Sequence, residues 1–190
     1  MKHLLILHGD AEKAGINHEF AKAYRQGAES VGAAVKELYI MDLKFNSNKQ
    51  FSNQITPLEP DLLMALERVQ WASHIVLFCT VNHSSIPARL SGFFDRLFLP
   101  PLQGMADKQA KGLGVYPGKS ARIVSVLDEE SWKEWQLTKK PTYHAIKRSV
   151  LERCRISPVR TCTIGYVHSP ENDYAKKWIA KMQAFGEKFM

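Results

Sequence analysis

The sequence predicts an α/β fold: a five-stranded parallel sheet in the doubly wound order 2-1-3-4-5, with helices on both faces. The prediction rests on an alternation along the chain. Short apolar runs typical of buried strands are followed by segments whose apolar residues recur every three or four positions, as in amphipathic helices. There is no internal repeat and no domain linker, so residues 1–190 are expected to form one domain.

Five short segments are predicted as strands. The first is a continuous apolar run that ends at Gly9, and the third is similarly apolar, as expected where both faces of a sheet are covered. The second alternates well enough for a strand. The expected strands are Leu4–Leu7, Val35–Ile40, His74–Cys79, Ala121–Leu127 and Val159–Val167.

Five longer segments are predicted as helices. Asn17 suits the N-cap of the first and Gly32 its end, while Pro60 suits the first turn of the second. Residues 42–60 form a long polar connection, and the glycine- and proline-rich residues 102–118 are expected to be irregular. The expected helices are Asn17–Val31, Pro60–Ala72, Pro87–Phe98, Thr142–Cys154 and Asn172–Phe189.

The composition excludes several classes of protein. Apolar residues make up 45% and charged residues 24%, which argues against disorder. No apolar run approaches the roughly 18 residues that span a bilayer, and the N-terminal burst lacks a cleavage site, so we expect neither membrane insertion nor a signal peptide. Three scattered cysteines fit neither a disulfide framework nor a zinc site. A cytoplasmic protein without a metal is the simplest expectation.

The net charge of +7 is concentrated at one end of the chain. Residues 1–132 hold 14 basic and 14 acidic residues, whereas residues 133–190 hold 12 and 5. The basic residues form no run of five and no nucleic-acid-binding module. This pattern favours solvated helix faces that attract an anionic ligand over a nucleic-acid surface.

In the predicted sheet, ligands bind beyond the carboxyl ends of the strands, where the winding reverses between strands one and three. This rule selects the loops Gly9–Asn17 and Thr80–Ser85, with Leu127–Trp132 beside them. The first loop leads into a helix N-terminus, which favours an anion such as phosphate. Its glycines also suit any junction between a strand and a helix, so both interpretations stay open.

The second loop suits a planar ligand rich in heteroatoms, whose edge Asn82 and His83 could address. The alternative is a solvated turn that caps the following helix. Likewise, Asp95-Arg96 could be a solvated charge pair. His83 lacks a second ligand at a useful spacing, so a metal site is not predicted.

Residues 69–99 resemble the flavodoxin-fold NAD(P)H:quinone oxidoreductases, a family that includes ancillary subunits of potassium efflux systems. The resemblance is carried by Trp71-Ala72-Ser73, Pro87-Ala88 and the block Gly92-Phe93-Phe94-Asp95-Arg96. Gly118-Lys119, Cys154 and the order of elements also fit, so it extends over nearly the whole chain.

The resemblance implies FMN, held by three loops, with NAD(P)H as hydride donor and a quinone-like acceptor. FAD is less expected, because the chain ends after the fifth strand–helix unit. The implied cofactor-binding residues are Gly9, Gly15, Ile16 and Asn17 in the first loop, Thr80, Val81, Asn82 and His83 in the second, and Leu127 and Trp132 in the third. No catalytic residue is assigned, and His83 is the candidate proton donor. A homodimer is also implied, to which the helix of Phe93 and Phe94 and residues 102–118 could contribute.

All three loops depart from the family pattern. Gly15 lacks the hydroxyl that the family places at the phosphate, and Asn82 and His83 replace an aromatic wall. Asp128-Glu129-Glu130 put three carboxylates where glycines normally approach the flavin. These departures favour an alternative, a flavin-free or weakly flavin-binding regulatory subunit that docks peripherally on a membrane transporter. If these acids turn into the space expected for the flavin ring, they argue against an oxidoreductase. Trp132 could either cover the ring or pack on the protein's own surface.

Overall fold

The computed structural model describes residues 2–10, 14–47, 58–98, 115–138, 145–167 and 171–189. Its five strands are all parallel and lie in the order β2-β1-β3-β4-β5, which confirms the predicted fold class. The strands are β1 (His3–His8), β2 (Ala34–Tyr39), β3 (His74–Val81), β4 (Ser120–Leu127) and β5 (Val159–Ile164).

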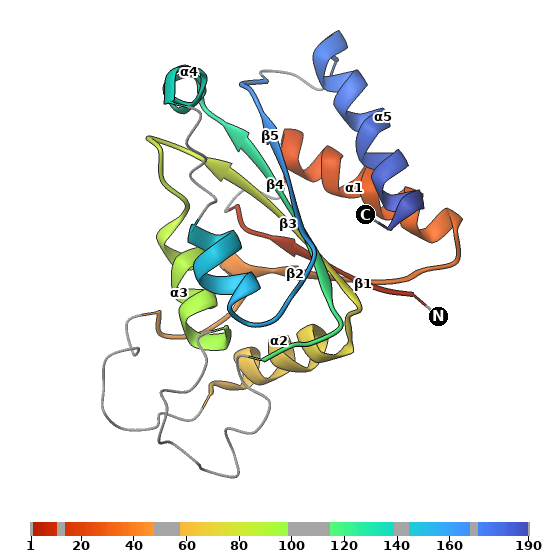
Figure 1. Ribbon diagram of the computed structural model, residues 1–190, viewed down its shortest axis with the longest axis vertical. Helices are drawn as coiled ribbons and strands as arrows, with labels where there is room; N and C mark the ends of the chain where they lie inside the picture. The colour runs from red at the N-terminus through yellow and green to blue at the C-terminus, as the bar shows by residue number, and fades with distance from the viewer. Residues whose placement is uncertain are drawn as a thin grey trace.

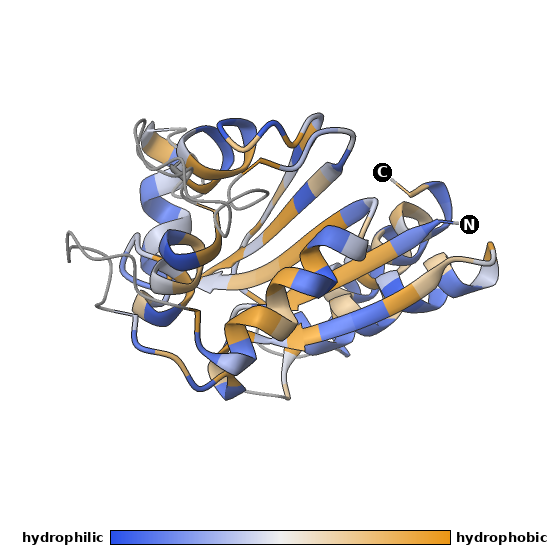
Figure 2. Cartoon of the chain, turned by 90° about the horizontal axis from the view of Figure 1, so that it is seen from below, coloured by the Kyte–Doolittle hydropathy of each residue, from blue (hydrophilic) through white to orange (hydrophobic). Residues whose placement is uncertain are grey.

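Helices cover both faces of the sheet (Figure 1). α1 (Ile16–Ser30) and α5 (Asp173–Lys188) lie on one face, and α2 (Pro60–Trp71), α3 (Ala88–Leu97) and η4 (Ala145–Glu152) lie on the other. The short helix η1 (Ile40–Asp42) follows β2, and α4 (Glu129–Thr138) lies beyond the carboxyl end of β4. The inner strands are largely hydrophobic, whereas the helices mix hydrophobic and hydrophilic residues (Figure 2), as a covered sheet requires.

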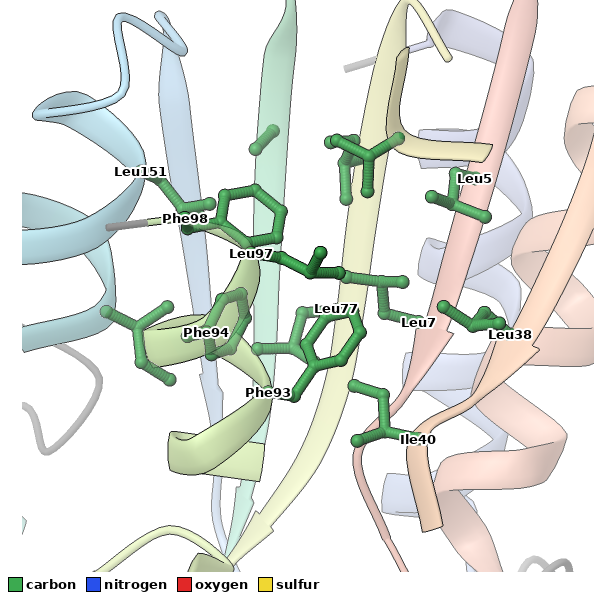
Figure 3. Packing of buried hydrophobic residues seen from close by; sticks show 14 of the residues in the cluster. Leu5, Leu7, Leu38, Ile40, Leu77, Phe93, Phe94, Leu97, Phe98 and Leu151 are labelled. Carbon is green, nitrogen blue, oxygen red and sulfur yellow. The ribbon is translucent and has the colours of Figure 1, made fainter. Parts of the chain in front are cut away.

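Two hydrophobic clusters fill the space between the sheet and its helices. On the α3 face, Phe93 and Phe94 pack toward the sheet residues Leu7 and Leu77 (Figure 3). Both phenylalanine side chains are at most 2% exposed. They therefore stabilise the core of this chain, and the contribution of their helix to a dimer stays a prediction.

On the other face, α1 and α5 cross at two glycines. A Cβ on Gly27 would lie 2.0 Å from the Gln183 carbonyl oxygen, and one on Gly186 would lie 2.1 Å from the Tyr24 carbonyl oxygen. No real Cβ approaches so closely, so both positions require glycine. The helices thus meet backbone against backbone.

The structure corrects several predicted boundaries. β3 continues through Thr80 and Val81, which were predicted in a loop, and β5 ends at Ile164 instead of Val167. The helix predicted over 142–154 is a π-helix, η4; residues 142–144 lie outside the described part of the chain, as do residues 102–114 of the predicted irregular stretch.

Helix α4 was not predicted, because residues 127–132 were interpreted as a loop. Asp128 precedes it, and the Asp128 carboxylate accepts a hydrogen bond from the Ser131 N–H at 2.7 Å, as an N-cap does. Glu129 and Glu130 occupy its first turn, where negative charge is favourable. The three acids that departed from the family pattern are thus the beginning of a helix.

The Asp95-Arg96 pair was left open as a solvated charge pair, but Arg96 is buried. Its side chain is 6% exposed and bonds Glu59 through both guanidinium nitrogens, at 2.6 and 3.2 Å. It also donates to the Asn46 carbonyl at 2.6 Å. Despite burial, these bonds lower the pKa of Glu59 to about 2. Arg96, on α3, therefore holds both described ends of the polar connection that follows η1, at Asn46 and at Glu59.

Cys79, Cys154 and Cys162 are buried free thiols. Over the described ranges, no helix combines the length and apolar character that crossing a membrane requires. The same residues contain no group of three side chains placed to hold a metal ion.

Candidate functional site

The candidate site lies at the carboxyl ends of β1 and β3, where the winding of the sheet reverses. Three segments lead away from this edge: the loop between β1 and α1, the turn after β3, and the start of α4 after β4 (Figure 1). The loops chosen from sequence are therefore adjacent in the fold, as predicted.

Gly9 is explained by packing. Its N–H donates to the Phe78 carbonyl at 2.8 Å and continues the ladder between β1 and β3. A Cβ here would lie 2.9 Å from the Leu90 side chain and 3.2 Å from the Cys79 Cβ, so a side chain has no room. Gly9 thus brings the two strand ends together.

The N-terminus of α1 is open and positively polarised. Gly15 precedes the helix with a φ of 106°, which favours glycine, and no atom of the described residues, from which residues 11–13 are missing, lies within 4 Å of where its Cβ would be. The first N–H groups of the helix, at Ile16 and Asn17, have no acceptor within the helix and carry the positive end of its dipole. This helix end can bind an anion through backbone amides without the missing hydroxyl.

Asn17 joins the first loop to the end of β3. Its Nδ2 donates to Asp10 Oδ2 at 2.6 Å and to Thr80 Oγ1 at 3.0 Å. The Thr80 N–H donates to the other Asp10 oxygen at 2.6 Å. Burial raises the pKa of Asp10, although these hydrogen bonds oppose the shift. A partly desolvated carboxyl group therefore stands beside the anion-binding helix end.

The other end of the Asn17 amide is unsatisfied. Asn17 is 8% exposed, and among the described residues its Oδ1 has no hydrogen-bond partner. A buried amide oxygen without a donor costs free energy of about 1–3 kcal/mol. A ligand hydroxyl at this position would satisfy it.

The loop after β3 is a tight four-residue turn. Asn82 and Ser85 exchange two backbone hydrogen bonds, at 3.1 and 2.9 Å. The central residues His83 and Ser84 have φ values of 47° and 55°, as in a type I′ turn. Val81 is buried, whereas Asn82 and the His83 side chain are exposed.

The start of α4 is hydrogen-bonded to this turn. The His83 N–H donates to Asp128 Oδ2 at 3.0 Å, and the Ser84 N–H donates to Ser131 Oγ at 2.9 Å. The Ser84 hydroxyl donates to Glu134. Although burial acts in the other direction, hydrogen bonds from Ser131 and His83 lower the pKa of Asp128. Two turn amides that could have addressed a ligand are therefore engaged by side chains of the protein.

Of the three acids, Asp128 alone bonds backbone amides at this edge. The exposed side chain of Glu130 lies 3.0 Å from Nδ1 of His83, which is 83% exposed. Glu129 pairs with Lys133 at 2.6 Å, and both side chains are about two-thirds exposed. Asp128 and Glu130 therefore turn toward the second loop, whereas Glu129 pairs with Lys133 on the exposed side of α4.

The two remaining predicted residues contribute to packing. Leu127 is buried at the end of β4. The Trp132 ring stacks on Trp135 with centroids 4.9 Å apart and lies against Gly165, where a Cβ would be 2.8 Å away. Of the two interpretations of Trp132, the structure shows the one in which it packs on the protein's own surface.

Asp10, Asp128 and Ser131 lie in the loops selected from sequence, but Asp10 was not singled out there and the bonds of Asp128 and Ser131 to the turn after β3 were not predicted. Asp10 could have been noticed as an acid one residue after Gly9 at the end of a buried strand. An acid followed by two more acids, as at Asp128, signals a helix N-terminus. Nothing in the sequence signals the bond between Ser131 and the Ser84 amide.

The chain belongs to the family described as the flavodoxin-like fold, whose family model matches residues 1–185. Its structure is similar to that of Smu.1420 from Streptococcus mutans UA159, with a TM-score of 0.76 and 23% identity over 98% of this chain and 99% of that one. It is also similar to an NAD(P)H:quinone oxidoreductase from Methanothermobacter marburgensis, with a TM-score of 0.75 and 15% identity over 100% and 99%.

A third similar structure is an FMN-dependent NADH-azoreductase from Bacillus anthracis str. Ames Ancestor in complex with FMN. Its TM-score is 0.65 at 10% identity, over 100% of this chain and 99% of that one. No curated protein sequence matches the chain. At these identities the structural similarities establish the shared fold.

The edge fits FMN in part. The open end of α1 suits a phosphate, and the unsatisfied Asn17 Oδ1 suits a hydroxyl of the ribityl chain. Beside the ring position, Asp128 and Glu130 supply acceptors, whereas the amides of His83 and Ser84 are already engaged. An isoalloxazine ring has one N–H donor for such acceptors. The first loop therefore fits the cofactor better than the second and the third.

Proposed function

We propose that the chain is an FMN-dependent oxidoreductase that takes hydride from NAD(P)H and passes two electrons to a quinone-like acceptor. The supporting observation is Asn17: it joins the first loop to Thr80 beside an open helix N-terminus and keeps an unsatisfied, buried oxygen. Two of the similar structures are, by name, an NAD(P)H:quinone oxidoreductase and an FMN-dependent azoreductase.

In this proposal, the chain's residues bind and orient the cofactor. The amides at Ile16 and Asn17 bind the phosphate, and Asn17 Oδ1 accepts from a ribityl hydroxyl. The turn after Val81 supports the ring. Bound FMN supplies hydride acceptance and two-electron transfer, while the protein supplies placement and electrostatics.

His83 is the proposed proton donor at the rim of the site. Its Nδ1 lies 3.0 Å from Glu130, and because a carboxylate only accepts, Nδ1 carries the hydrogen there; Nε2 therefore has a proton to give when the imidazole is doubly protonated. Both side chains are exposed, so this proton exchanges readily with solvent.

A flavin-free binding subunit is the second candidate, and the engaged amides of His83 and Ser84 favour it. These donors are satisfied by Asp128 and Ser131, so the turn is complete without a ligand. In this case the edge is a structural remnant, and the chain acts by docking, as in peripheral association with a transporter.

The two candidates are separated by loading the purified chain with FMN under anaerobic conditions. The enzyme loses the visible absorbance of bound flavin when NADH or NADPH is added, and a quinone restores it. We expect Asn17→Ala to weaken FMN binding by about tenfold, equivalent to 1.4 kcal/mol. Gln26→Ala, on an exposed position of the same helix, is the matched control and should bind as the wild type does.

Absence of FMN binding in the wild-type chain would favour the flavin-free subunit. Equal affinities of the Asn17 and Gln26 variants would contradict the proposed role of Asn17. The proposed homodimer is tested separately, by the molar mass of the purified chain in light scattering.

A further inference from the structure

A second possible ligand site lies at the opposite end of the sheet. A cavity of about 120 Å³ opens at the amino ends of β3, β4 and β5. This volume exceeds what a single water molecule needs. Three polar side chains, His74, Ser120 and Arg160, belong to its lining, which is completed by Ala121, Pro158 and Phe189.

The cavity lies on the face of the sheet that α1 and α5 cover. His74 and Arg160 stand two residues before Val76 and Cys162, which belong to the core cluster on that face. Successive side chains of a strand alternate between faces, so residues two apart share one. The His74 ring also lies 5.6 Å from that of Phe189, the residue after α5.

Two arginines stand side by side here. Arg122 and Arg160 are register partners in the parallel strands β4 and β5. Their strands are neighbours, about 4.8 Å apart, and Arg160 is exposed, whereas Arg122 is not. Arg122 is 4% exposed; it donates to the Cys162 sulfur at 3.3 Å and lies over the Phe185 ring at 3.9 Å. Positive charge is thus concentrated near the amino ends of β4 and β5, where it favours an anion.

A chain of hydrogen bonds extends from Arg122 to the cavity. The Arg122 guanidinium has only donors, so it donates to the Tyr24 hydroxyl oxygen. The Tyr24 hydroxyl therefore donates its own proton to His74 Nε2, which lies 3.1 Å from the hydroxyl oxygen. His74 Nδ1 then carries the ring proton and donates to Ser120 Oγ, at 2.7 Å. Ser120 accepts in this series of hydrogen bonds, so its hydroxyl proton takes no part in the series.

His74 is held neutral. Burial lowers the pKa of His74 to about 4, and the charges of Arg122 and Arg160 act in the same direction. A neutral imidazole carries a single proton, which agrees with the order of donors along the chain. The Ser120 hydroxyl and the Arg160 guanidinium are thus donors at one small cavity.

We propose that this cavity binds a small inorganic oxyanion, phosphate or sulfate, between the Ser120 hydroxyl and the Arg160 guanidinium. Arg122 adds positive charge behind the site through its place beside Arg160. The site is separate from the edge proposed for FMN, which lies at the carboxyl ends of the strands. Binding here stabilises the folded chain by mass action.

The test is calorimetric titration of the full-length chain with inorganic phosphate, with sodium chloride at equal ionic strength as the reference. We expect saturable binding in the wild type. Arg160→Gln should weaken it by about tenfold or more, because a hydrogen bond to a charged group is lost. Ser120→Ala should weaken it by a few fold.

Arg148→Gln is the matched control, because it removes the same charge from an exposed position on η4, on the other face of the sheet. It should leave the affinity unchanged. Equal losses in the two arginine variants would indicate nonspecific charge and overturn the proposal. A wild type that responds to phosphate only as it does to chloride would also overturn it.

Phosphate could instead bind at the N-terminus of α1. In that case Asn17→Ala weakens binding and Arg160→Gln does not, which would also contradict the proposal. The result does not depend on FMN, so failure of this site leaves the proposed function standing.

Discussion

Replacing Asp10 by asparagine tests where the phosphate of FMN binds. The Asp10 carboxylate accepts from the Asn17 side chain and from the Thr80 N–H, both at 2.6 Å. The asparagine oxygen can keep the bond from Thr80. If the Asn17 amide turns over, its Oδ1 accepts from the new amide group and from the Thr80 hydroxyl, and its Nδ2 takes over the bond to the ribityl hydroxyl as a donor. The substitution therefore removes a charge while preserving the joint.

The expected gain in FMN affinity follows from Coulomb's law. The phosphate would bond the Asn17 backbone N–H, whereas the Asp10 carboxylate bonds the Asn17 side-chain Nδ2, so two hydrogen bonds and the span between these two nitrogens put the charges at least roughly 6 Å apart. At an effective dielectric constant of about 20, two unit charges at this distance repel by about 2.8 kcal/mol. Asp10 is half-buried, and screening by salt lowers this value to about 1–2 kcal/mol. We therefore expect Asp10→Asn to bind FMN about 5–30-fold more tightly at neutral pH.

The pH dependence provides the assay. Burial raises the pKa of Asp10, so protonation neutralises it at a higher pH than usual for an aspartate. Affinity for FMN, measured by quenching of flavin fluorescence, should rise as the pH falls through this pKa. The pH dependence of FMN affinity should be weaker in Asp10→Asn than in the wild type. Titration of the FMN phosphate affects both proteins equally, so the difference between them reports Asp10. Asp173→Asn, at a side chain 91% exposed on α5, is the control.

The same pKa shift predicts the stability of the chain without FMN. Folding raises the pKa of Asp10. The contribution of Asp10 to the free energy of unfolding is therefore fully present at low pH and is lost as the pH rises through the pKa of Asp10 in the folded state. Unchanged affinity and unchanged pH dependence in Asp10→Asn would refute the placement of the phosphate beside this carboxyl group.

The remaining predictions concern stability, measured by urea unfolding. Glu59→Gln leaves the buried Arg96 side chain without its carboxylate partner and should lower the free energy of unfolding by about 2–3 kcal/mol. Folding lowers the pKa of Glu59 from 4.5 to about 2, so the stabilisation by Glu59 is complete above pH 4.5 and is lost as the pH falls toward 2. A loss no larger than that of an exposed glutamate would contradict this. Gly186→Ala places a Cβ 2.1 Å from the Tyr24 carbonyl and should cost more than about 2 kcal/mol, so a near-neutral result would show that α1 and α5 can separate freely. Asp128→Ala removes the cap of α4 and should cost about 1–2 kcal/mol, together with faster amide exchange in the turn after β3; unchanged exchange would show that this carboxylate does not hold the turn.

The strand order was predictable because the signals that determine it are local. The apolar runs of β1, β3 and β4 indicate strands covered on both faces, and the intervening helices require parallel pairing. The position of the ligand edge then follows from the order alone. This is why Asn17 and Thr80, 63 residues apart, could be assigned to the same edge.

Other features depend on contacts between distant segments, which the sequence does not show. The bond between Arg96 and Glu59 required the packing of α3 against the polar connection. The first turn of α4 was missed because the family resemblance suggested a flavin loop at Asp128, and this outweighed the local signal of an N-cap. The link from Ser84 to Ser131 joins the turn after β3 to the first turn of α4 and has no local signal at all.

The most direct test of the central claim is calorimetric titration of the wild-type chain, purified without added flavin, with FMN. The account predicts one FMN per chain with a dissociation constant of about 10 μM or tighter. An absence of saturable heat up to about 1 mM FMN would contradict it, and would show that the bonds from Asp128 and Ser131 to the turn have replaced the cofactor.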